Sequence, residues 1–301
     1  MRWRKLGILV PAPPPLGWAA SHAALPVVET LDDGRIRIYF STRDERSRSR
    51  IAAAELSLNG SEPPEYRPDP VLDLGPTGSF DDSGVTSACL VRKGDRRHLY
   101  YSGWTVGSTV PFYFYVGCAI SEDDGRTWRR ASPAPVLERD AVDPYLTASP
   151  AVLVENGTWR MWYVSGTGWT PASGGPRHHY HLKYAESEDG IRWRRTGRVC
   201  IDYSDESEYA IARPSVVKDD DVYRMWFCAR GDRYRIFYAQ SQDGLEWERG
   251  GEAELDVGPN GWDSEMQAYP AVFDCLGSRY MLYNGNGFGA TGIGWAVMET
   301  T

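Results

Sequence analysis

Acidic residues recur directly before a short apolar segment in four parts of the chain, where they could supply acid–base chemistry. They are Asp82, Asp143, Glu208 and Glu265. Carboxylates that converge on one cavity repel each other, which raises the pKa of at least one of them. A carboxyl group with a raised pKa can donate a proton while an ionised neighbour acts as base or nucleophile. We therefore name Asp82, Glu208 and Glu265 as candidate catalytic residues, although acids at these positions could also cap turns.

One copy of the apolar segment begins with an arginine, where the other copies carry a neutral side chain. This residue is Arg213. A guanidinium among acids either forms an ion pair, for example with Glu208 or Asp143, or holds an anionic group of a bound molecule.

Further side chains near these positions could orient a bound molecule. Tryptophan rings stack on the apolar faces of sugar rings, amides hydrogen bond to hydroxyl groups, and histidine can transfer protons. The candidate substrate-binding residues are His22, Trp104, Asp143, Trp169, Arg213, Tyr269, Asn284 and Asn286. The alternative for the two tryptophans is packing between structural units.

A longer insertion at 166–181 holds three of the five histidines. The spacing of His178, His179 and His181 is not typical of metal ligands, so we predict no bound metal and no cofactor. We expect the insertion to be an exposed loop that could overhang the site.

A repeated unit of structure must position these residues. The segment SEDDGRTW at 121–128 returns as SEDGIRW at 187–193 and as SQDGLEW at 241–247. In each copy Asp-Gly supplies a tight hairpin turn, because glycine accepts a positive φ. Aromatic segments such as HLYYSGW and RMWYVSG precede the turns. Small apolar segments come before these, roughly 60 residues apart, and are anchored at Pro26, Ser87, Pro150, Pro214 and Pro270.

Five such units predict an all-β fold. Each unit reads as four antiparallel strands, which is the blade of a propeller. The last unit lacks an outer strand, and residues 3–9 have strand character and could fill that edge. We therefore predict a five-bladed β-propeller with four-stranded antiparallel blades, whose ring is closed by the N-terminal strand. Residues 1–301 form a single domain in this prediction, and a β-sandwich is the alternative.

Composition argues against several classes of function. Hydrophobic residues make up 42% of the chain, which is enough for a sizeable core. The formal net charge of -8 argues against a nucleic-acid partner. No segment is apolar for long enough to span a membrane, and the N-terminus does not read as a signal peptide. Five cysteines without a Cys-x-x-Cys pair favour a reduced, cytoplasmic protein. The oligomeric state stays open.

Two resemblances rest on these motifs. The 121–128 segment is similar to the Asp-box of sialidases and other propellers, a structural turn that lies away from the active site. The whole layout resembles the five-bladed glycoside hydrolase superfamily of families 32, 43, 62, 68, 117 and 130, and within it the bacterial glycosyl hydrolase-like proteins associated with polysaccharide pathways. The motifs that carry this likeness are the Ser-x-Asp-Gly turns, ARPSV at 212–216, GWDSEM at 261–266 and YNGNG at 283–287.

The resemblance implies that carboxylates on the inner strands are catalytic. Family 43-type enzymes use an Asp on the first blade as base, an Asp on a middle blade as pKa modulator, and a Glu as general acid. In this chain His22 stands where the first-blade Asp is expected, and Asp82 is the nearest substitute. The family 43 mechanism therefore does not carry over intact.

Together these features favour an enzyme that cleaves or modifies a glycosidic bond in an axial pocket with paired carboxylates. Its partner would be a carbohydrate or glycoconjugate. One alternative is a glycan-binding propeller without catalysis. Another is a glycoside phosphorylase, in which Arg213 with Arg230 or Arg233 would bind phosphate.

Overall fold

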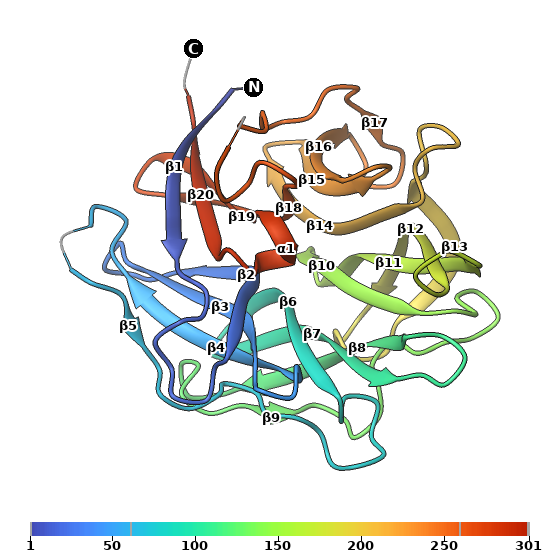
Figure 1. Cartoon of the computed structure of the whole chain (residues 1–301), viewed down its shortest axis with the longest axis horizontal. Helices are drawn as coiled ribbons and strands as arrows, with labels where there is room; N and C mark the ends of the chain where they lie inside the picture. Colours follow the sequence, from blue (N-terminus) through green and yellow to red (C-terminus); the bar gives the residue numbers. More distant parts are fainter. Residues whose placement is uncertain (1, 61, 259, 300–301) are drawn as a thin grey trace.

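Antiparallel strands make up most of the chain in the computed structural model, which describes residues 2–60, 62–258 and 260–299 (Figure 1). The described residues contain one short helix, α1 (Asn286–Gly289). The prediction of an all-β fold is confirmed.

The strands follow one another in five antiparallel meanders, in which each strand pairs with the next along the chain. The first meander is β2 (Ser21–Thr30), β3 (Ile36–Arg43), β4 (Ser49–Leu56) and β5 (Glu65–Tyr66). The second is β6 (Gly84–Lys93), β7 (Arg96–Val106), β8 (Phe112–Ser121) and β9 (Arg129–Arg130). The third is β10 (Thr147–Glu155), β11 (Thr158–Thr170), β12 (Arg177–Ser187) and β13 (Arg194–Ile201).

The fourth and fifth meanders continue this pattern. The fourth is β14 (Ala210–Asp219), β15 (Val222–Arg230), β16 (Tyr234–Ser241) and β17 (Glu248–Arg249). The fifth is β18 (Ala268–Cys275), β19 (Ser278–Asn284) and β20 (Ile293–Met298), and β20 pairs with β1 (Trp3–Val10) as its outer neighbour. Single parallel bridges join β4 to β6 and β12 to β14, so the hydrogen-bonded sheets have four, eight and eight strands, and none of them closes on itself.

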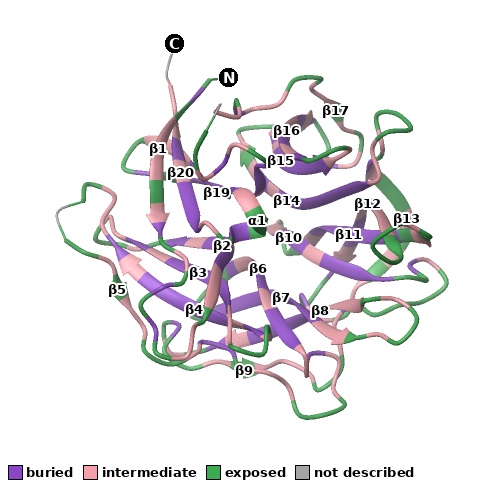
Figure 2. Cartoon of the chain, viewed as in Figure 1, coloured by how far each residue is buried: buried purple, intermediate pink, exposed green. Residues whose placement is uncertain are grey.

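The first strand of each meander lies nearest the centre of the molecule in Figure 1. These innermost strands contact one another in the order β2, β6, β10, β14, β18 and back to β2. The core lies between neighbouring meanders and is filled by their middle strands, as the buried colour of β3, β7, β11 and β15 in Figure 2 shows. Trp159, Trp162 and Trp226 are among its largest fully buried side chains.

Each innermost strand is interrupted by an irregularity in its pairing with the next strand. In four of them a non-glycine residue there has a positive φ, namely Leu25 (54°), Ser149 (43°), Arg213 (56°) and Tyr269 (59°). This backbone conformation is unfavourable for residues with a side chain and is found mostly where the surrounding structure imposes it. The same deviation therefore recurs around the centre of the molecule.

The repeated Ser-x-Asp-Gly segments form turns that share one set of hydrogen bonds. In the third meander Ser187 Oγ accepts from the backbone N–H of Gly190 at 2.9 Å and donates to Asp189 at 3.0 Å. Ser121 and Ser241 make the equivalent bonds in their own turns. Each turn glycine has a positive φ, as the sequence pattern predicts.

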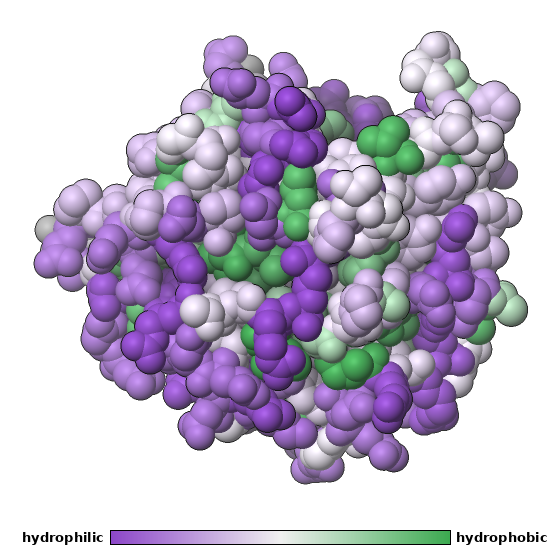
Figure 3. All heavy atoms as spheres, turned by 90° about the horizontal axis from the view of Figure 1, so that it is seen from below, coloured by the Kyte–Doolittle hydropathy of each residue, from purple (hydrophilic) through white to green (hydrophobic). Residues whose placement is uncertain are grey.

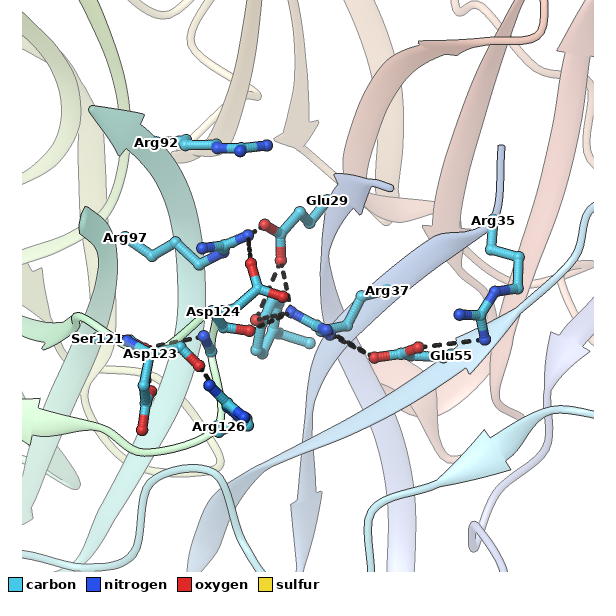
Figure 4. A network of polar contacts seen from close by, with 12 residues as sticks. Glu29, Arg35, Arg37, Glu55, Arg92, Arg97, Ser121, Asp123, Asp124 and Arg126 are labelled. Carbon is cyan, nitrogen blue, oxygen red and sulfur yellow. Dashed lines mark hydrogen bonds and ion pairs between the residues drawn. The ribbon is translucent and has the colours of Figure 1, made fainter. Parts of the chain in front are cut away.

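A network of charged residues, with Glu29 and Arg97 buried, joins the first meander to the second (Figure 4). Glu29 on β2 accepts from Arg97 on β7 at 2.5 Å and from Arg37 on β3 at 3.1 Å. Arg97 also pairs with Asp124, in the turn after β8, and Arg37 donates to the carbonyl of Asp124 at 2.9 Å. These contacts fix the Asp-Gly turn of one meander against the middle strand of its neighbour.

The N-terminal strand pairs with the last strand, as the sequence predicts. Its Trp3 donates from Nε1 to Glu254 at 2.8 Å and packs edge-on against Trp226, with ring centroids 6.0 Å apart. On the side of the molecule shown in Figure 3, hydrophilic residues cover most of the surface and hydrophobic residues show in the hollows between them. Among the described residues, no helix is long and apolar enough to cross a membrane.

Candidate active site

A pocket of about 280 Å³ opens among the ends of the innermost strands. Much of its wall is aromatic, formed by Trp104, Phe112, Phe114, Tyr180, Tyr269 and Phe288. Hydroxyl groups also line it, from Ser41, Ser49, Thr86, Ser102 and Ser149. Its titratable basic groups are His22 and Arg43, and no Asp or Glu is among the described residues that form the wall. Rings beside hydroxyl groups are typical of sites that stack on a sugar and hydrogen bond to it.

His22 on β2 and Arg43 on β3 both line this pocket, which we call the axial pocket. His22 has a positive φ of 62°, and its Nδ1 lies 2.9 Å from Ser21 Oγ. Burial, and then the charge of Arg43, lowers the pKa of His22, so the imidazole is neutral at pH 7. Burial also lowers the pKa of Arg43, which forms no ion pair with any carboxylate in the described part of the chain.

Three predicted contact residues, His22, Trp104 and Tyr269, line the axial pocket. Trp104 is half-buried and donates from Nε1 to Ser49 Oγ at 2.9 Å, which fixes its ring in the wall. Tyr269 is the residue at the irregularity of β18, and burial raises the pKa of its hydroxyl. Their predicted role in substrate binding is consistent with this placement and stays a prediction.

Arg213 is buried at the centre, but it meets neither of the acids proposed as its partners. Its Nη1 donates to the carbonyl of Ser87 at 2.7 Å and its Nη2 to that of Pro26 at 2.6 Å. Burial lowers the pKa of Arg213 to about 10. The side chain therefore ties β14 to β6 and β2 across the axis, which corrects the expected ion pair with Glu208 or Asp143.

Asp143 does not line the axial pocket, because it points into the interior of its own meander. The carboxylate is fully buried and accepts from Tyr163 at 2.9 Å and Ser165 at 2.6 Å. Lys183 lies 3.2 Å from it and Arg195 2.9 Å. Its hydrogen-bonding capacity is used within the protein, so we revise Asp143 from a substrate contact to a structural residue.

The same arrangement recurs in other meanders at the equivalent acid. Asp81 accepts from Tyr101 and pairs with Arg130 of β9, and Asp263 accepts from Tyr283 and pairs with Lys5 of β1. In each of these meanders one cation comes from the outermost strand, and Asp143 has a second cation, Lys183, on β12. We call these sets the acid–cation clusters.

Glu208 is the member of this series in the fourth meander, although the sequence suggested a catalytic role. Arg249 on β17 donates hydrogen bonds to both carboxylate oxygens of Glu208, and the bond from Nη1 to Oε2 is 2.8 Å long. Ser204 donates a backbone N–H to Oε2 at 3.0 Å. The carboxylate oxygens of Glu208 are thus engaged by Arg249 and the backbone, so they are not free to contact a substrate.

Asp82 and Glu265 also lie outside the lining of the axial pocket. Asp82 accepts from the N–H of Gly78 at 2.9 Å and from Ser83 Oγ at 2.9 Å, so it caps the loop that leads into β6. Glu265 is exposed, and its side chain has no ion pair or hydrogen bond within the described residues. The convergence of the three predicted carboxylates on one pocket is therefore not found.

Both predicted asparagines are engaged in the protein itself. Asn284 is buried and bonds to the carbonyls of Ala23 and Gly292 and to the N–H of Leu25. Asn286 accepts from the N–H of Glu265 at 2.8 Å. These hydrogen bonds fix the loop that carries Phe288 into the axial pocket. The two amides therefore position the loop and do not line the pocket wall themselves.

The 166–181 insertion extends β11 and β12 as a hairpin instead of forming the expected loop. Trp169 packs on Phe112 and His178, with centroids 5.3 and 5.9 Å apart, outside the pocket lining. His178 stacks on Tyr180 at 4.7 Å. The hairpin thus packs against Phe112 and Tyr180 of the aromatic wall. No group of three His, Cys, Asp or Glu side chains that could hold a metal ion occurs among residues 2–60, 62–258 and 260–299.

Sequence reasoning missed Arg43, Phe112, Phe114 and Tyr180. A signal for Arg43 was present, because the segment RIYFSTR places it at the position that Trp104 holds in HLYYSGW. Phe112, Phe114 and Tyr180 lie on third strands, whose ends carry no repeated motif that would mark them.

Comparison with known proteins places the chain in a family. No family model matches it. An uncharacterized protein of Mycobacterium tuberculosis is 46% identical over 301 residues, covering 99% of this chain and 100% of that protein. The chain belongs to the same family as this mycobacterial protein. A 1,2-beta-oligomannan phosphorylase of Thermoanaerobacter is 31% identical over 131 residues, which are 41% of this chain and 44% of that enzyme.

Solved structures show the fold shared by this family. A thermostable family-43 glycoside hydrolase superposes with a TM-score of 0.72 at 15% identity, covering 96% of this chain and 93% of that one. A family-32 beta-fructofuranosidase of Bombyx mori gives 0.68 at 16% identity, over 97% of this chain and 61% of that one. The resemblance to the propeller glycoside hydrolases is thus confirmed at the level of the fold.

Proposed function

We propose that this chain is a carbohydrate-active enzyme that acts on a glycosidic bond in its axial pocket. The observation that carries the proposal is the pocket itself, where aromatic rings and hydroxyl groups meet at the centre of a glycoside hydrolase fold. A sugar offers apolar ring faces and many hydroxyl groups, so it matches such a wall. The oligomannan phosphorylase with partial sequence similarity supports a sugar as the ligand.

The proposal includes the fold in its finer form. Each meander would be one four-stranded blade of a five-bladed propeller, with β1 completing the fifth blade, and residues 1–301 would form a single domain. The cyclic contacts of the innermost strands support this arrangement. The bridges between β4 and β6 and between β12 and β14 would then be contacts between neighbouring blades.

Glu265 is our first candidate for the general acid. Its carboxylate has no partner among the described residues, and Asn286 holds its backbone beside the loop that carries Phe288 into the pocket. Asp82 is second, because it would have to give up its capping bonds. Glu208 is third, because it would have to leave Arg249.

The test is turnover of an oligosaccharide panel with and without inorganic phosphate. The panel contains β-1,2-linked mannan oligosaccharides, arabino-oligosaccharides and sucrose, and chromatography detects free sugars and sugar 1-phosphates. We expect one substrate to be cleaved, and phosphate dependence to separate phosphorolysis from hydrolysis. Glu265→Gln should lower kcat at least 100-fold, whereas Glu252→Gln, another exposed glutamate, should keep it. Equal rates in both variants would remove Glu265 from the mechanism.

A second candidate function is sugar binding without catalysis. The observation that favours it is the absence of Asp and Glu from the described pocket wall. Calorimetric binding of a sugar that is not turned over, together with unchanged binding in Glu265→Gln, would support this function over the enzyme.

We also propose that the protein works in a reducing compartment such as the cytoplasm. All five cysteines are free thiols, and burial raises the pKa of each of them. Thiols of this kind need no oxidising environment for folding. Fractionation of the native host would test the location.

A further inference from the structure

Among the described residues that line the axial pocket, the ionisable groups other than tyrosine are bases, either cationic or neutral. Arg43 and His22 line it, and no carboxylate does so among the described residues. We propose that the ligand of this pocket carries an anionic group, a phosphate or a carboxylate on its sugar, and that Arg43 binds that group. This inference rests on the proposed function, in which the pocket takes a sugar.

Arg43 has no acid beside it, in contrast to several other half-buried arginines. Arg37 pairs with Glu29, Arg130 with Asp81, and Arg195 with Asp143. Arg43 forms no ion pair within the described residues, although burial disfavours its charge and lowers its pKa. A half-buried guanidinium without a counter-charge is costly, and an anion from solution would offset this cost. Its planar fork of donors fits the oxygens of phosphate and carboxylate.

The side chains around Arg43 are neutral or cationic, so its counter-charge would have to come from a bound ligand. The neighbouring His22 is neutral at pH 7, so its ring has one N–H that donates a hydrogen bond and one nitrogen that accepts one. Tyr269, which also lines the pocket, is a neutral phenol because burial raises its pKa. Arg230 holds the position on β15 that Arg43 holds on β3, and it lies 5.7 Å from the ring of Phe288 in the pocket wall. Two cationic side chains, Arg43 and Arg230, therefore lie in or beside the wall of the pocket.

The wall also gives the ligand an orientation. Arg43 stands on the first meander, whereas Trp104, Phe112 and Phe114 form the aromatic face on the second. The tilted rings of Phe112 and Phe114, with centroids 4.8 Å apart, make this face continuous. A sugar ring that lies against this face would direct a substituent on its other side toward Arg43.

The experiment compares neutral sugars with their charged derivatives by isothermal titration calorimetry. The probes are D-mannose, D-mannose 6-phosphate, α-D-mannose 1-phosphate, D-glucose, D-glucuronate and inorganic phosphate. We expect at least one charged sugar to bind tenfold or more tightly than its neutral parent. Arg43→Gln should reduce that ratio below threefold. Arg46→Gln, at an exposed site in the adjacent turn, should keep the wild-type ratio.

The outcomes separate this inference from the proposed function. The inference of an anionic ligand is overturned if neutral and charged sugars bind equally, or if Arg43→Gln leaves the ratio of their affinities unchanged. Neither result would contradict the proposal that the pocket binds a sugar. If inorganic phosphate binds as tightly as the sugar phosphates, the inference is also overturned. Arg43 would then bind free phosphate as a second ligand, and the sugar itself would not need an anionic group. Failure of every sugar to bind overturns the proposed function itself. If Arg43→Gln does not fold, the salt dependence of binding to the wild-type protein is the test. Added NaCl must lower the affinity for the charged sugar and must leave the affinity for the neutral sugar unchanged.

Discussion

Charged residues inside this molecule differ in whether the protein neutralises them. Asp143 is enclosed by Lys183, Arg195 and two hydroxyl groups, whereas Arg43 faces a pocket with no acid in its described wall. A carboxylate that the fold has already paired stabilises the fold, and an unpaired cation in a pocket is available to a ligand. The two residues therefore serve stability and binding, respectively.

Loss of one partner in an acid–cation cluster should unfold the protein more readily. Asp143→Asn leaves the largely buried charge of Lys183 uncompensated and leaves Arg195 paired with Asp140 alone. We therefore expect it to lower the free energy of unfolding by about 3–5 kcal/mol. Urea denaturation followed by circular dichroism measures this. The matched change Glu265→Gln, at an exposed and unpaired carboxylate, should stay within about 0.5 kcal/mol of wild type. Similar costs for both would contradict the structural role of Asp143.

Acid should destabilise the protein partly through His178. Burial first, and then Arg230, His179 and Arg177, lowers the pKa of His178 to about 4 in the folded state. The unfolded chain binds this proton near pH 6.5, so between these values it holds more protons than the folded chain. Stability from His178 is therefore complete above about pH 6.5 and is lost as the pH falls toward 4, by roughly 2–3 kcal/mol.

The control for this titration is His178→Gln, which cannot take up a proton. Urea unfolding of both proteins at pH 7 and pH 4.5 gives the loss in each, and the other histidines contribute equally to both. We expect the wild-type protein to lose more stability than the variant. Identical losses would mean that His178 titrates normally in the folded protein.

Residue types alone could locate the candidate site only in part. The repeats correctly marked His22, Trp104 and Tyr269 as residues at the centre. They could not tell whether an acid just before an innermost strand faces the axis or its own meander, because both directions give the same spacing. For Asp143 the direction is set by Tyr163 and Arg195, which lie 20 and 52 positions further along the chain. Contacts of that range are not visible in a local pattern.

The Asp-Gly turns are elements that the sequence predicts well, because their hydrogen bonds are local. Ser121, Ser187 and Ser241 each bind a backbone N–H and the carboxylate of the Asp two residues on. The tryptophan after each turn was expected to cover it. In two turns Trp128 and Trp247 donate from Nε1 to the carbonyl of the turn glycine, at 3.0 and 3.1 Å. In the turn that begins at Ser187, Trp193 is half-buried, and its buried Nε1 has no hydrogen-bond partner among the described residues.

This difference predicts unequal costs for the same substitution. Trp247→Phe removes a hydrogen bond and leaves the carbonyl of Gly244 with one partner fewer, whereas Trp193→Phe removes a donor that had no partner. The loss of ring volume is common to both. We expect Trp247→Phe to cost about 1 kcal/mol more than Trp193→Phe in chemical unfolding. Trp128→Phe should behave like Trp247→Phe, and a larger cost at Trp193 would contradict the assignment.

At the scale of the whole molecule, the order of the repeats allowed most of the architecture to be predicted. Five copies of one unit predict five meanders, and the incomplete last copy predicts the pairing of β1 with β20. The cross-meander ions, such as Glu29 with Arg97, could not be predicted, because they join residues 68 positions apart. Neither could the parallel bridges that merge neighbouring meanders into eight-stranded sheets.

The pairing of the two chain ends should make the molecule unfold as one unit. Trp3 on β1 is buried against Trp226 of the fourth meander and donates to Glu254, while β1 itself pairs with β20 of the fifth. Trp3→Ala removes contacts with both meanders, so we expect it to lower the free energy of unfolding of the whole chain by about 3–5 kcal/mol. Ile8→Ala, in the same strand but 47% exposed, should cost less than about 1 kcal/mol. Tryptophan fluorescence and far-ultraviolet circular dichroism should report one coincident transition in all three proteins, since a single domain unfolds cooperatively. A separate early transition in Trp3→Ala would mean that the last meander melts on its own, and the single-domain proposal would fail.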